Sequence, residues 1–125
     1  MEDTVILFLD DDPNRAALMY QRMSPVDRAA TMWCQTVEDA IDILKEYKSR
    51  LREVHLDHDL GGVTFVYSGR NDCGMEVVRF LEKQSAKEYA NCKFICHSWN
   101  LPAGNDMTIR LTKAGYKTTR RPFGT

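Results

Sequence analysis

Polar residues that can bind a metal ion or transfer a proton follow three short apolar segments of this chain. The three polar clusters are Asp10-Asp11-Asp12, Asp57-His58-Asp59 and His97-Ser98. Clustered carboxylates repel one another and favour binding of a cation or a proton. Histidine changes its charge near neutral pH, which suits it to proton transfer. The residue types therefore predict a metal-assisted acid–base site, provided that the fold brings the clusters together.

The apolar segments before these clusters are typical of buried parallel strands. We predict strands over residues 5–9, 31–34, 54–56, 92–96 and 116–119. Helical patterns separate them and begin after Asp12-Pro13, after Thr36, at Gly74 and at Pro102. The alternation predicts an α/β fold, a doubly wound five-stranded parallel sheet in the order 2-1-3-4-5. Its carboxyl edge, where open α/β sheets bind ligands, would hold all three polar clusters.

Composition predicts one domain over residues 1–125 and sets limits on its partners. The chain has 17 Lys plus Arg and 18 Asp plus Glu, so its net charge of -1 predicts no general binding to duplex nucleic acid or to anionic membranes. The apolar run near the N-terminus is short and has an acidic flank, which fits neither a signal peptide nor a membrane span. We therefore expect a cytoplasmic protein.

Cysteine spacing argues against a zinc site. The four cysteines contain no C-x-x-C pair. Zinc bound by Cys92, Cys96 and His97 is the alternative, but four residues of strand would separate the two cysteines by about 13 Å, too far for one tetrahedral ion. We expect all four cysteines to be reduced core residues.

The segment after the fifth predicted strand is too short for a helix. In the order 2-1-3-4-5, the first helix and this missing helix would share one face of the sheet. An apolar strip beside the first helix should then remain partly uncovered. Exposed apolar patches usually bind a partner, so a homodimer through this face is a hypothesis.

Four motifs resemble those of response-regulator receiver domains, and the resemblance spans essentially the whole chain. The motifs are LFLDDDPNR, VHLD, FICHS and RRPFG. The resemblance implies that Asp10 and Asp11 form the acidic pair and that Asp57 is the phosphoacceptor or its relic. It also implies that Ser98 contacts phosphate and that Arg121 stands where receivers have lysine.

The same resemblance implies a magnesium site and one unusual peptide bond. Asp11, Asp57 and the backbone carbonyl of Asp59 would bind the ion. Pro122, which follows the residue in the lysine position, would have a cis peptide bond before it.

Three departures separate the chain from ordinary receivers. Arg121 has a planar fork that binds two phosphate oxygens, whereas lysine is a compact point charge. His58, Asp59 and His97 add titratable groups that receivers do not need at these places. The stretch from Asp57 to Gly74 also contains an insertion, GGVTFVYSGRND, which predicts a lid or pocket wall above the carboxylates.

LDHDLGG together with HSWN resembles a divergent receiver-like branch, the cyclic-phosphate processing receiver domains. For that branch the resemblance implies an enzymatic role on cyclic phosphate ends, with His97 as the catalytic histidine.

We assign the candidate residues to three chemical roles. The predicted catalytic residues are His97, Asp57 and His58. The predicted phosphate- or substrate-binding residues are Ser98, Asn100, Arg121 and Arg70. The predicted ligands of Mg²⁺ or Mn²⁺ are Asp10, Asp11, Asp57 and Asp59.

Structural roles are open for several of these positions. Asp12 is favoured as a helix cap. His97 suits a structural histidine bonded to a carboxylate as well as a catalytic one. Ser98 and Asn100 suit turn residues at a helix start, Arg70 suits a solvated loop residue, and His55, which lies within a strand, is expected to be structural.

Three functions are compatible with this site. The first is a metal-dependent phosphoesterase or cyclic phosphodiesterase acting on a nucleotide or RNA end. The second is a signalling receiver phosphorylated on Asp57, which Arg121, the insertion and the missing helix disfavour. The third is a degenerate receiver used as a protein-interaction module, which the retained carboxylates disfavour because unneutralised clustered acids are destabilising.

Overall fold

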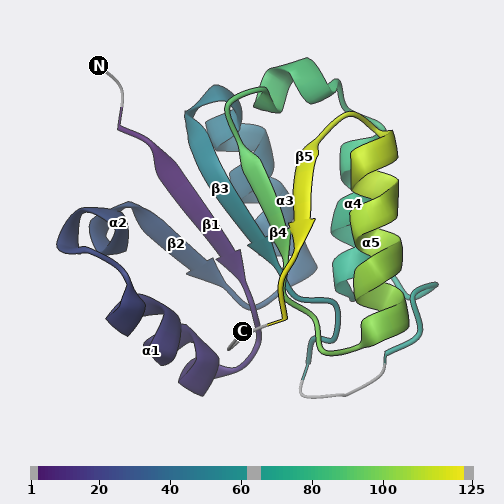
Figure 1. The fold of residues 1–125 in the computed structure, drawn as a ribbon, viewed down its shortest axis with the longest axis horizontal. Coiled ribbons are helices and arrows are strands. Elements are labelled where there is room, and N and C mark those ends of the chain that lie inside the picture. The colour runs from purple at the N-terminus through teal and green to yellow at the C-terminus, as the bar shows by residue number, and fades with distance from the viewer. Residues whose placement is uncertain (1–2, 62–65, 123–125) are drawn as a thin grey trace.

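A parallel sheet forms the centre of the computed structural model, which describes residues 3–61 and 66–122 (Figure 1). The order of the five strands in this part of the chain is β2-β1-β3-β4-β5, as predicted. The strands are β1 (Val5–Leu9), β2 (Thr31–Cys34), β3 (Leu51–Leu56), β4 (Lys93–Cys96) and β5 (Lys117–Arg120). All four pairings are parallel, so the strand ends meet at one edge.

Capping residues define the starts of the helices. The helices are α1 (Pro13–Arg22), α2 (Pro25–Ala30), α3 (Val37–Tyr47), α4 (Gly74–Glu82), α5 (Leu101–Lys113) and the short 3₁₀ helices η1 (Lys48–Arg50) and η2 (Ala86–Tyr89). The Asp12 carboxylate accepts from the amide of Asn14, which confirms Asp12 as the cap of α1. The prediction missed α2, although Ser24-Pro25 carries the same cap-and-proline signal.

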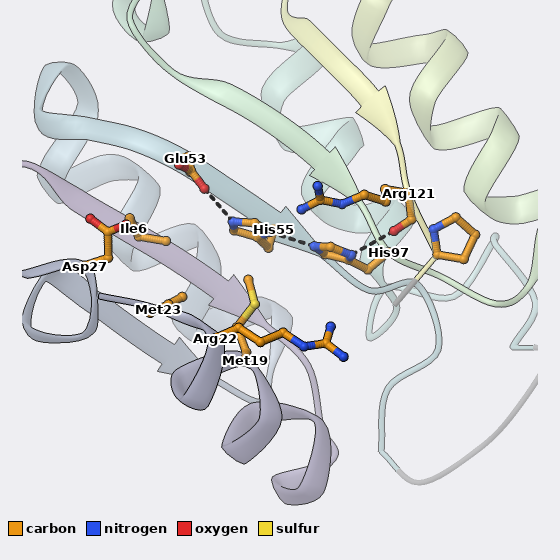
Figure 2. Close-up of a pocket in the computed structure, with 10 residues that line it drawn as sticks. Ile6, Met19, Arg22, Met23, Asp27, Glu53, His55, His97 and Arg121 are labelled. Atoms are coloured by element: carbon orange, nitrogen blue, oxygen red, sulfur yellow. Dashed lines mark hydrogen bonds and ion pairs between the residues drawn. The ribbon is translucent and has the colours of Figure 1, made fainter. Parts of the chain in front are cut away.

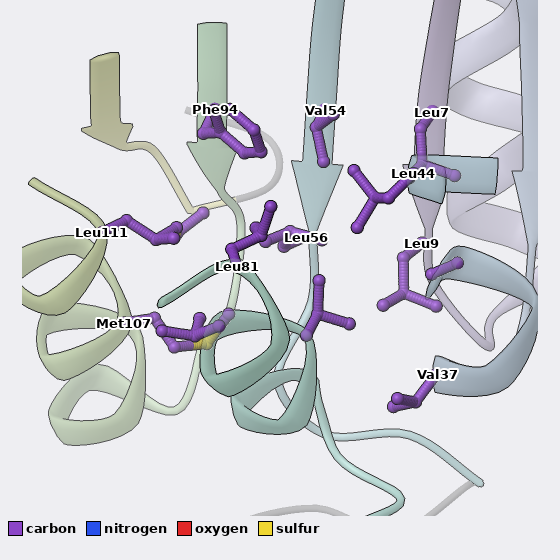
Figure 3. Close-up of a cluster of buried hydrophobic side chains, with 14 of the residues drawn as sticks. Leu7, Leu9, Val37, Leu44, Val54, Leu56, Leu81, Phe94, Met107 and Leu111 are labelled. Atoms are coloured by element: carbon purple, nitrogen blue, oxygen red, sulfur yellow. The ribbon is translucent and has the colours of Figure 1, made fainter. Parts of the chain in front are cut away.

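Three helices cover one face of the sheet and enclose the main hydrophobic core. Figure 3 shows leucines of β1 and β3 pointing toward side chains of α3, α4 and α5. The fully buried members include Leu7, Leu9, Leu44, Leu56, Leu81, Phe94, Met107 and Leu111. On the other face, α1 packs Ala16 and Met19 against Phe8 and Trp33. This packing fixes the positions of β1 and β3, and with them the positions of the polar residues that follow these two strands.

The sheet face without a covering helix among the described residues has a mixed apolar and polar surface. Over β3, β4 and β5 this face carries Glu53, His55, Lys93, Lys117 and Arg121 among the described residues. Its isoleucine on β4, Ile95, is only 9% exposed. Long charged side chains cover apolar surface with their stems, so this face tolerates water. The homodimer through this face stays a prediction.

All four cysteines are buried and form no disulfide. Burial raises the pKa of Cys34 and of Cys92 to about 12, so both thiols stay protonated and are poor zinc ligands. The cysteines are therefore core residues, as predicted. None of the helices within residues 3–61 and 66–122 is long and apolar enough to cross a membrane.

Candidate functional site

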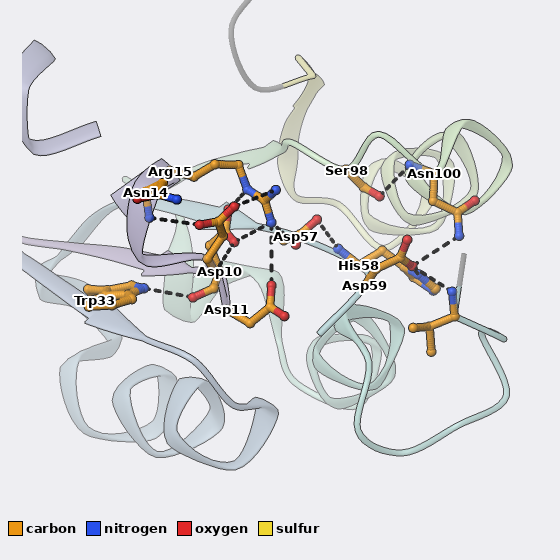
Figure 4. Close-up of polar contacts among 12 residues, drawn as sticks. Asp10, Asp11, Asn14, Arg15, Trp33, Asp57, His58, Asp59, Ser98 and Asn100 are labelled. Carbon is orange, nitrogen blue, oxygen red and sulfur yellow. Dashed lines mark hydrogen bonds and ion pairs between the residues drawn. The ribbon is translucent and has the colours of Figure 1, made fainter. Parts of the chain in front are cut away.

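Three carboxylates meet at the carboxyl edge, where β1 and β3 end side by side. Asp10 and Asp11 follow β1, Asp57 follows β3, and one carboxylate oxygen from each lies within 4.8 Å of the others. We call these three residues the Asp cluster (Figure 4). Asp10 is 1% and Asp57 7% exposed. Burial, and then the charge of Asp10, raises the pKa of Asp57 to about 7, so its neutral form is favoured more than that of an exposed carboxyl.

Arg15, on the first turn of α1, lies among these carboxylates, and the sequence prediction did not include it. Its Nε donates to Asp10 Oδ2 and its Nη2 to Asp10 Oδ1, both at 2.7 Å. Nη2 also lies 3.5 Å from an oxygen of Asp11 and 3.5 Å from one of Asp57. The hydrogen bond to Asp10 raises the pKa of Arg15. Helical side chains point toward the N-terminus, so the spacing from the Asp12 cap was an available signal.

The side chain of Asp59 lies outside the Asp cluster, and its backbone carbonyl stays the predicted metal ligand. Its Oδ1 accepts hydrogen bonds from His58 Nδ1 at 2.7 Å, from the Val66 amide at 3.0 Å and from Asn100 Nδ2 at 3.2 Å. These contacts join the segment after β3 to the loop after β4. The side chain of Asp59 therefore organises two loops.

His58 is fully buried and both of its ring nitrogens are bonded. Nδ1 lies 2.7 Å from the Asp59 carboxylate, and Nε2 lies 2.9 Å from Ser68 Oγ in the inserted segment. Its side chain thus points into the loop, while its backbone amide donates to Asp57 Oδ1 at 2.9 Å. His58 positions Asp57 and the insertion in this arrangement.

Ser98 and Asn100 shape the start of α5. Ser98 Oγ accepts from the Asn100 amide at 3.0 Å, and Asn100 Oδ1 accepts from the Ala103 amide at 3.4 Å. The turn-and-cap interpretation is thus realised for both residues. The contacts described for Ser98 use its oxygen as an acceptor, so its O–H can still donate to a ligand.

Gly74 lets α4 begin directly against the backbone that carries Asp57. Its amide donates to the His58 carbonyl at 2.8 Å. A Cβ at this position would lie 2.0 Å from the Asp57 carbonyl oxygen and 2.9 Å from His58 Cα, so only glycine fits without moving the backbone. The contact fixes the backbone on the carboxyl side of β3.

A second polar group lies on the uncovered sheet face, next to the Asp cluster (Figure 2). Glu53 Oε1 lies 2.9 Å from His55 Nε2, His55 Nδ1 lies 2.6 Å from His97 Nε2, and His97 Nδ1 lies 2.8 Å from the Arg121 carbonyl oxygen. The two imidazole rings are stacked, with centroids 4.9 Å apart. We call this group the histidine chain.

Proton counting constrains the histidine chain. Its two ends, the Glu53 carboxylate and the Arg121 carbonyl, only accept hydrogen bonds. Three hydrogen bonds then need three protons, one more than two neutral imidazoles carry. The bond from His55 lowers the pKa of Glu53, whereas burial, and then the charge of His55, lowers the pKa of His97 to about 3. His97 is therefore neutral, with its proton on Nδ1.

The histidine chain borders a cavity of about 320 Å³. Arg22 of α1 and Arg121 line opposite sides of it. Leu56 pairs with Cys96 in the β3–β4 ladder, so Asp57 and His97 are the next residues along two neighbouring strands. The cavity, His97 and the Asp cluster thus follow one another along the same sheet face.

Comparison with known proteins agrees with this arrangement. A family model described as "Cyclic-phosphate processing Receiver domain" matches residues 5–113. The chain belongs to this family. The match includes the Asp cluster, the LDHDLGG and HSWN motifs and the insertion, and it ends before Arg121. No curated protein matches the chain.

Solved structures similar to this cyclic-phosphate processing receiver domain include response-regulator proteins. The signal receiver domain of a DNA-binding response regulator protein (merR) from Colwellia psychrerythraea 34H is 18% identical, with a TM-score of 0.59 over 98% of this chain and 89% of that chain. A chain in the crystal structure of the P1 domain of CheA3 in complex with CheY6 from R. sphaeroides is 15% identical. Its TM-score is 0.52 over 100% of this chain and 87% of that chain. These similarities establish the receiver fold.

Two expected features of this receiver domain differ in the structure. Arg70 is exposed and pairs with its neighbour Asp72, with N–O distances of 2.9 and 2.6 Å, so the described contacts do not bring it to the Asp cluster. The described residues contain no cis peptide bond, so the cis bond expected before Pro122 is wrong. The carbonyl of Arg121, just before that bond, accepts from His97.

The Asp cluster suits the divalent cation that the receiver fold implies. Carboxylate oxygens are the ligands that Mg²⁺ and Mn²⁺ prefer. Three such oxygens converge here around one guanidinium, so negative charge remains. The carboxylate oxygens and the negative charge of the Asp cluster therefore fit a divalent cation.

Proposed function

We propose that this receiver domain binds Mg²⁺ or Mn²⁺ at Asp10, Asp11 and Asp57 and hydrolyses a cyclic phosphate on a nucleotide or RNA end. The convergence of three carboxylate oxygens within 4.8 Å of one another, around a single guanidinium, carries the proposal. The family description, cyclic-phosphate processing, supports the substrate class. When bound, the ion would supply a Lewis acid that withdraws charge from phosphate oxygens.

Three polar side chains are available for the phosphate itself. Arg121 borders the cavity beside the histidine chain and offers a planar fork for two oxygens. The Ser98 hydroxyl and the Asn100 amide lie at the start of α5, on the neighbouring strand end. The polar groups reach the phosphate from β4 and β5, while the Asp cluster lies at the ends of β1 and β3.

Proton transfer is assigned to His97. Hydrolysis joins a water oxygen to phosphorus and breaks one phosphorus–ribose oxygen bond, so the water loses one proton and the ribose oxygen gains one. His97 Nδ1, now bonded to the Arg121 carbonyl, gives its proton to the ribose oxygen, and His55 replaces that proton at Nε2. A carboxylate of the Asp cluster accepts the proton of the water.

The decisive experiment is ³¹P NMR of 2',3'-cyclic nucleotides incubated with the protein and Mg²⁺ or Mn²⁺. We expect a monoester signal that Asp57→Asn abolishes and His97→Ala reduces by about 10²-fold or more. Asp72→Asn is the matched control, because it removes an exposed carboxylate that pairs with Arg70. An unchanged wild-type spectrum would remove these nucleotides as substrates.

A second candidate function is a phosphoacceptor receiver. The receiver fold of the structural neighbours, together with the position of Asp57 at the end of β3, favours it. Acetyl phosphate would then add one phosphate to the chain, visible by intact mass. Asp57→Asn would lose this addition, whereas His97→Ala would leave it nearly unchanged.

A further inference from the structure

We infer that Arg15 is the resident cation of the Asp cluster, and that it exchanges with the divalent ion and then binds the phosphate of the substrate. The inference rests on the proposed function, since it assumes that the Asp cluster binds a metal. Arg15 was not among the site residues predicted from the sequence motifs.

Arg15 occupies the same oxygens that a metal would need. Its guanidinium makes two 2.7 Å hydrogen bonds to Asp10 and lies 3.5 Å from oxygens of both Asp11 and Asp57. These are the three residues whose carboxylate oxygens converge. A guanidinium and a divalent cation repel each other at such distances, so full occupancy by both is unfavourable.

The surroundings of Arg15 let it leave the cluster without losing every partner. Its side chain is 30% exposed, and its Nη1 lies 3.3 Å from Asp12 Oδ2. Asp12 caps α1 and lies outside the Asp cluster. After exchange, Arg15 keeps this exposed carboxylate as a partner and stays at the border of the cluster, because its backbone is fixed in the first turn of α1.

A guanidinium released at this border is suited to phosphate. Its planar fork binds two phosphate oxygens through charge-assisted hydrogen bonds. Arg121 approaches from β5, beside the histidine chain, whereas Arg15 approaches from α1. A phosphate next to the loaded cluster would then contact the Arg15 guanidinium. The exchange thereby couples metal binding to phosphate binding.

Calorimetric titration of the metal-free protein with Mn²⁺ tests the exchange without any turnover. Arg15→Gln removes the competing charge, and we expect it to bind Mn²⁺ at least about tenfold more tightly than wild type. Arg15→Lys keeps a charge but loses the bidentate bond to Asp10, so its affinity should be intermediate. Arg110→Gln is the matched control, because Arg110 forms a similar bidentate pair with Glu82 elsewhere on the surface.

A second titration, with inorganic phosphate at saturating Mn²⁺, tests the released guanidinium. Arg15→Gln should bind phosphate about tenfold more weakly than wild type, while Arg110→Gln binds it equally. Unchanged Mn²⁺ affinity in Arg15→Gln and Arg15→Lys would overturn the exchange and leave the metal site standing. Unchanged phosphate affinity would overturn the role in substrate binding. Absence of Mn²⁺ binding in every variant would overturn the proposed metal site and this inference together.

Discussion

The Asp cluster and the histidine chain lie next to each other on one sheet face, but opposite electrostatic principles hold them together. The Asp cluster gathers like charges around one guanidinium, and burial, followed by the charge of Asp10, raises the pKa of Asp57 to about 7. The histidine chain alternates donors with acceptors, so each bond supports the next. The comparison teaches that neighbouring polar groups suit different roles, since the Asp cluster suits a cation and the histidine chain suits proton relay. The cluster has charge left to neutralise, whereas the chain is internally satisfied.

The largest expected effect comes from breaking the histidine chain at His97. His97→Ala removes a buried ring and leaves His55 Nδ1 and the Arg121 carbonyl without their partner. We expect a loss of about 3 kcal/mol in the free energy of unfolding at pH 8, measured with urea. Trp99→Ala, a neighbouring exposed aromatic residue, is the control and should change it by less than about 0.5 kcal/mol.

The cost of His97→Ala should shrink in acid. The folded pKa of His97, about 3, lies below its unfolded value of 6.5. The stability that depends on neutral His97 is therefore present above pH 6.5 and is lost as the pH falls toward 3. A cost that stays constant between pH 8 and pH 4 would contradict the buried, neutral state of His97.

The Asp cluster should respond in the opposite sense. The folded pKa of Asp57, about 7, lies above the unfolded value of 3.8, so this group favours folding below pH 3.8 and loses that contribution as the pH rises through 7. Asp57→Asn should therefore stabilise the metal-free protein at pH 8 by about 2–4 kcal/mol, and little at pH 4.

Thermal melting at the two pH values measures this effect. Asp72→Asn, on an exposed carboxylate, should leave the melting temperature nearly unchanged. Saturating Mn²⁺ should raise the melting temperature of wild type but not of Asp57→Asn. Destabilisation by Asp57→Asn at pH 8 would show that the Asp cluster is internally satisfied, like the histidine chain.

The smallest expected effect sharpens the proton count in the histidine chain. Glu53→Gln replaces an acceptor with an amide that can donate to His55 Nε2, so all three hydrogen bonds survive with two neutral imidazoles. We expect it to cost less than about 0.5 kcal/mol, whereas Glu53→Ala, which removes the partner, should cost about 1–2 kcal/mol. Equal costs in urea unfolding would show that the Glu53 end of the chain contributes nothing.

The strand order and the Asp cluster follow from features that a sequence displays directly. Short apolar runs specify the strands, and Asp12-Pro13 specifies where α1 begins. Since parallel strands end at one edge, Asp10 and Asp57 had to lie near each other. Period two along β3 also places His55 and Asp57 on one face.

Side-chain partners could not be predicted in the same way. Arg15 has several rotatable bonds, and its preference for Asp10 over solvent depends on charges from two strands. His55 appeared structural because it lies within a strand, yet its stacking on His97 depends on the register between β3 and β4. The sequence also indicates no partner for the Asp59 carboxylate, which accepts from Asn100 in the loop after β4.

The close approach of Gly74 to the Asp57–His58 backbone also defines a place where the intervening loop can be replaced by another. The chain departs from the sheet after Asp57 and returns to the same place at Gly74, where the amide-to-carbonyl bond with His58 closes the excursion. The entropy of closing such an excursion grows only slowly with its length. Segments of different length and composition can therefore be exchanged between Asp57 and Gly74 while Asp57 keeps its position.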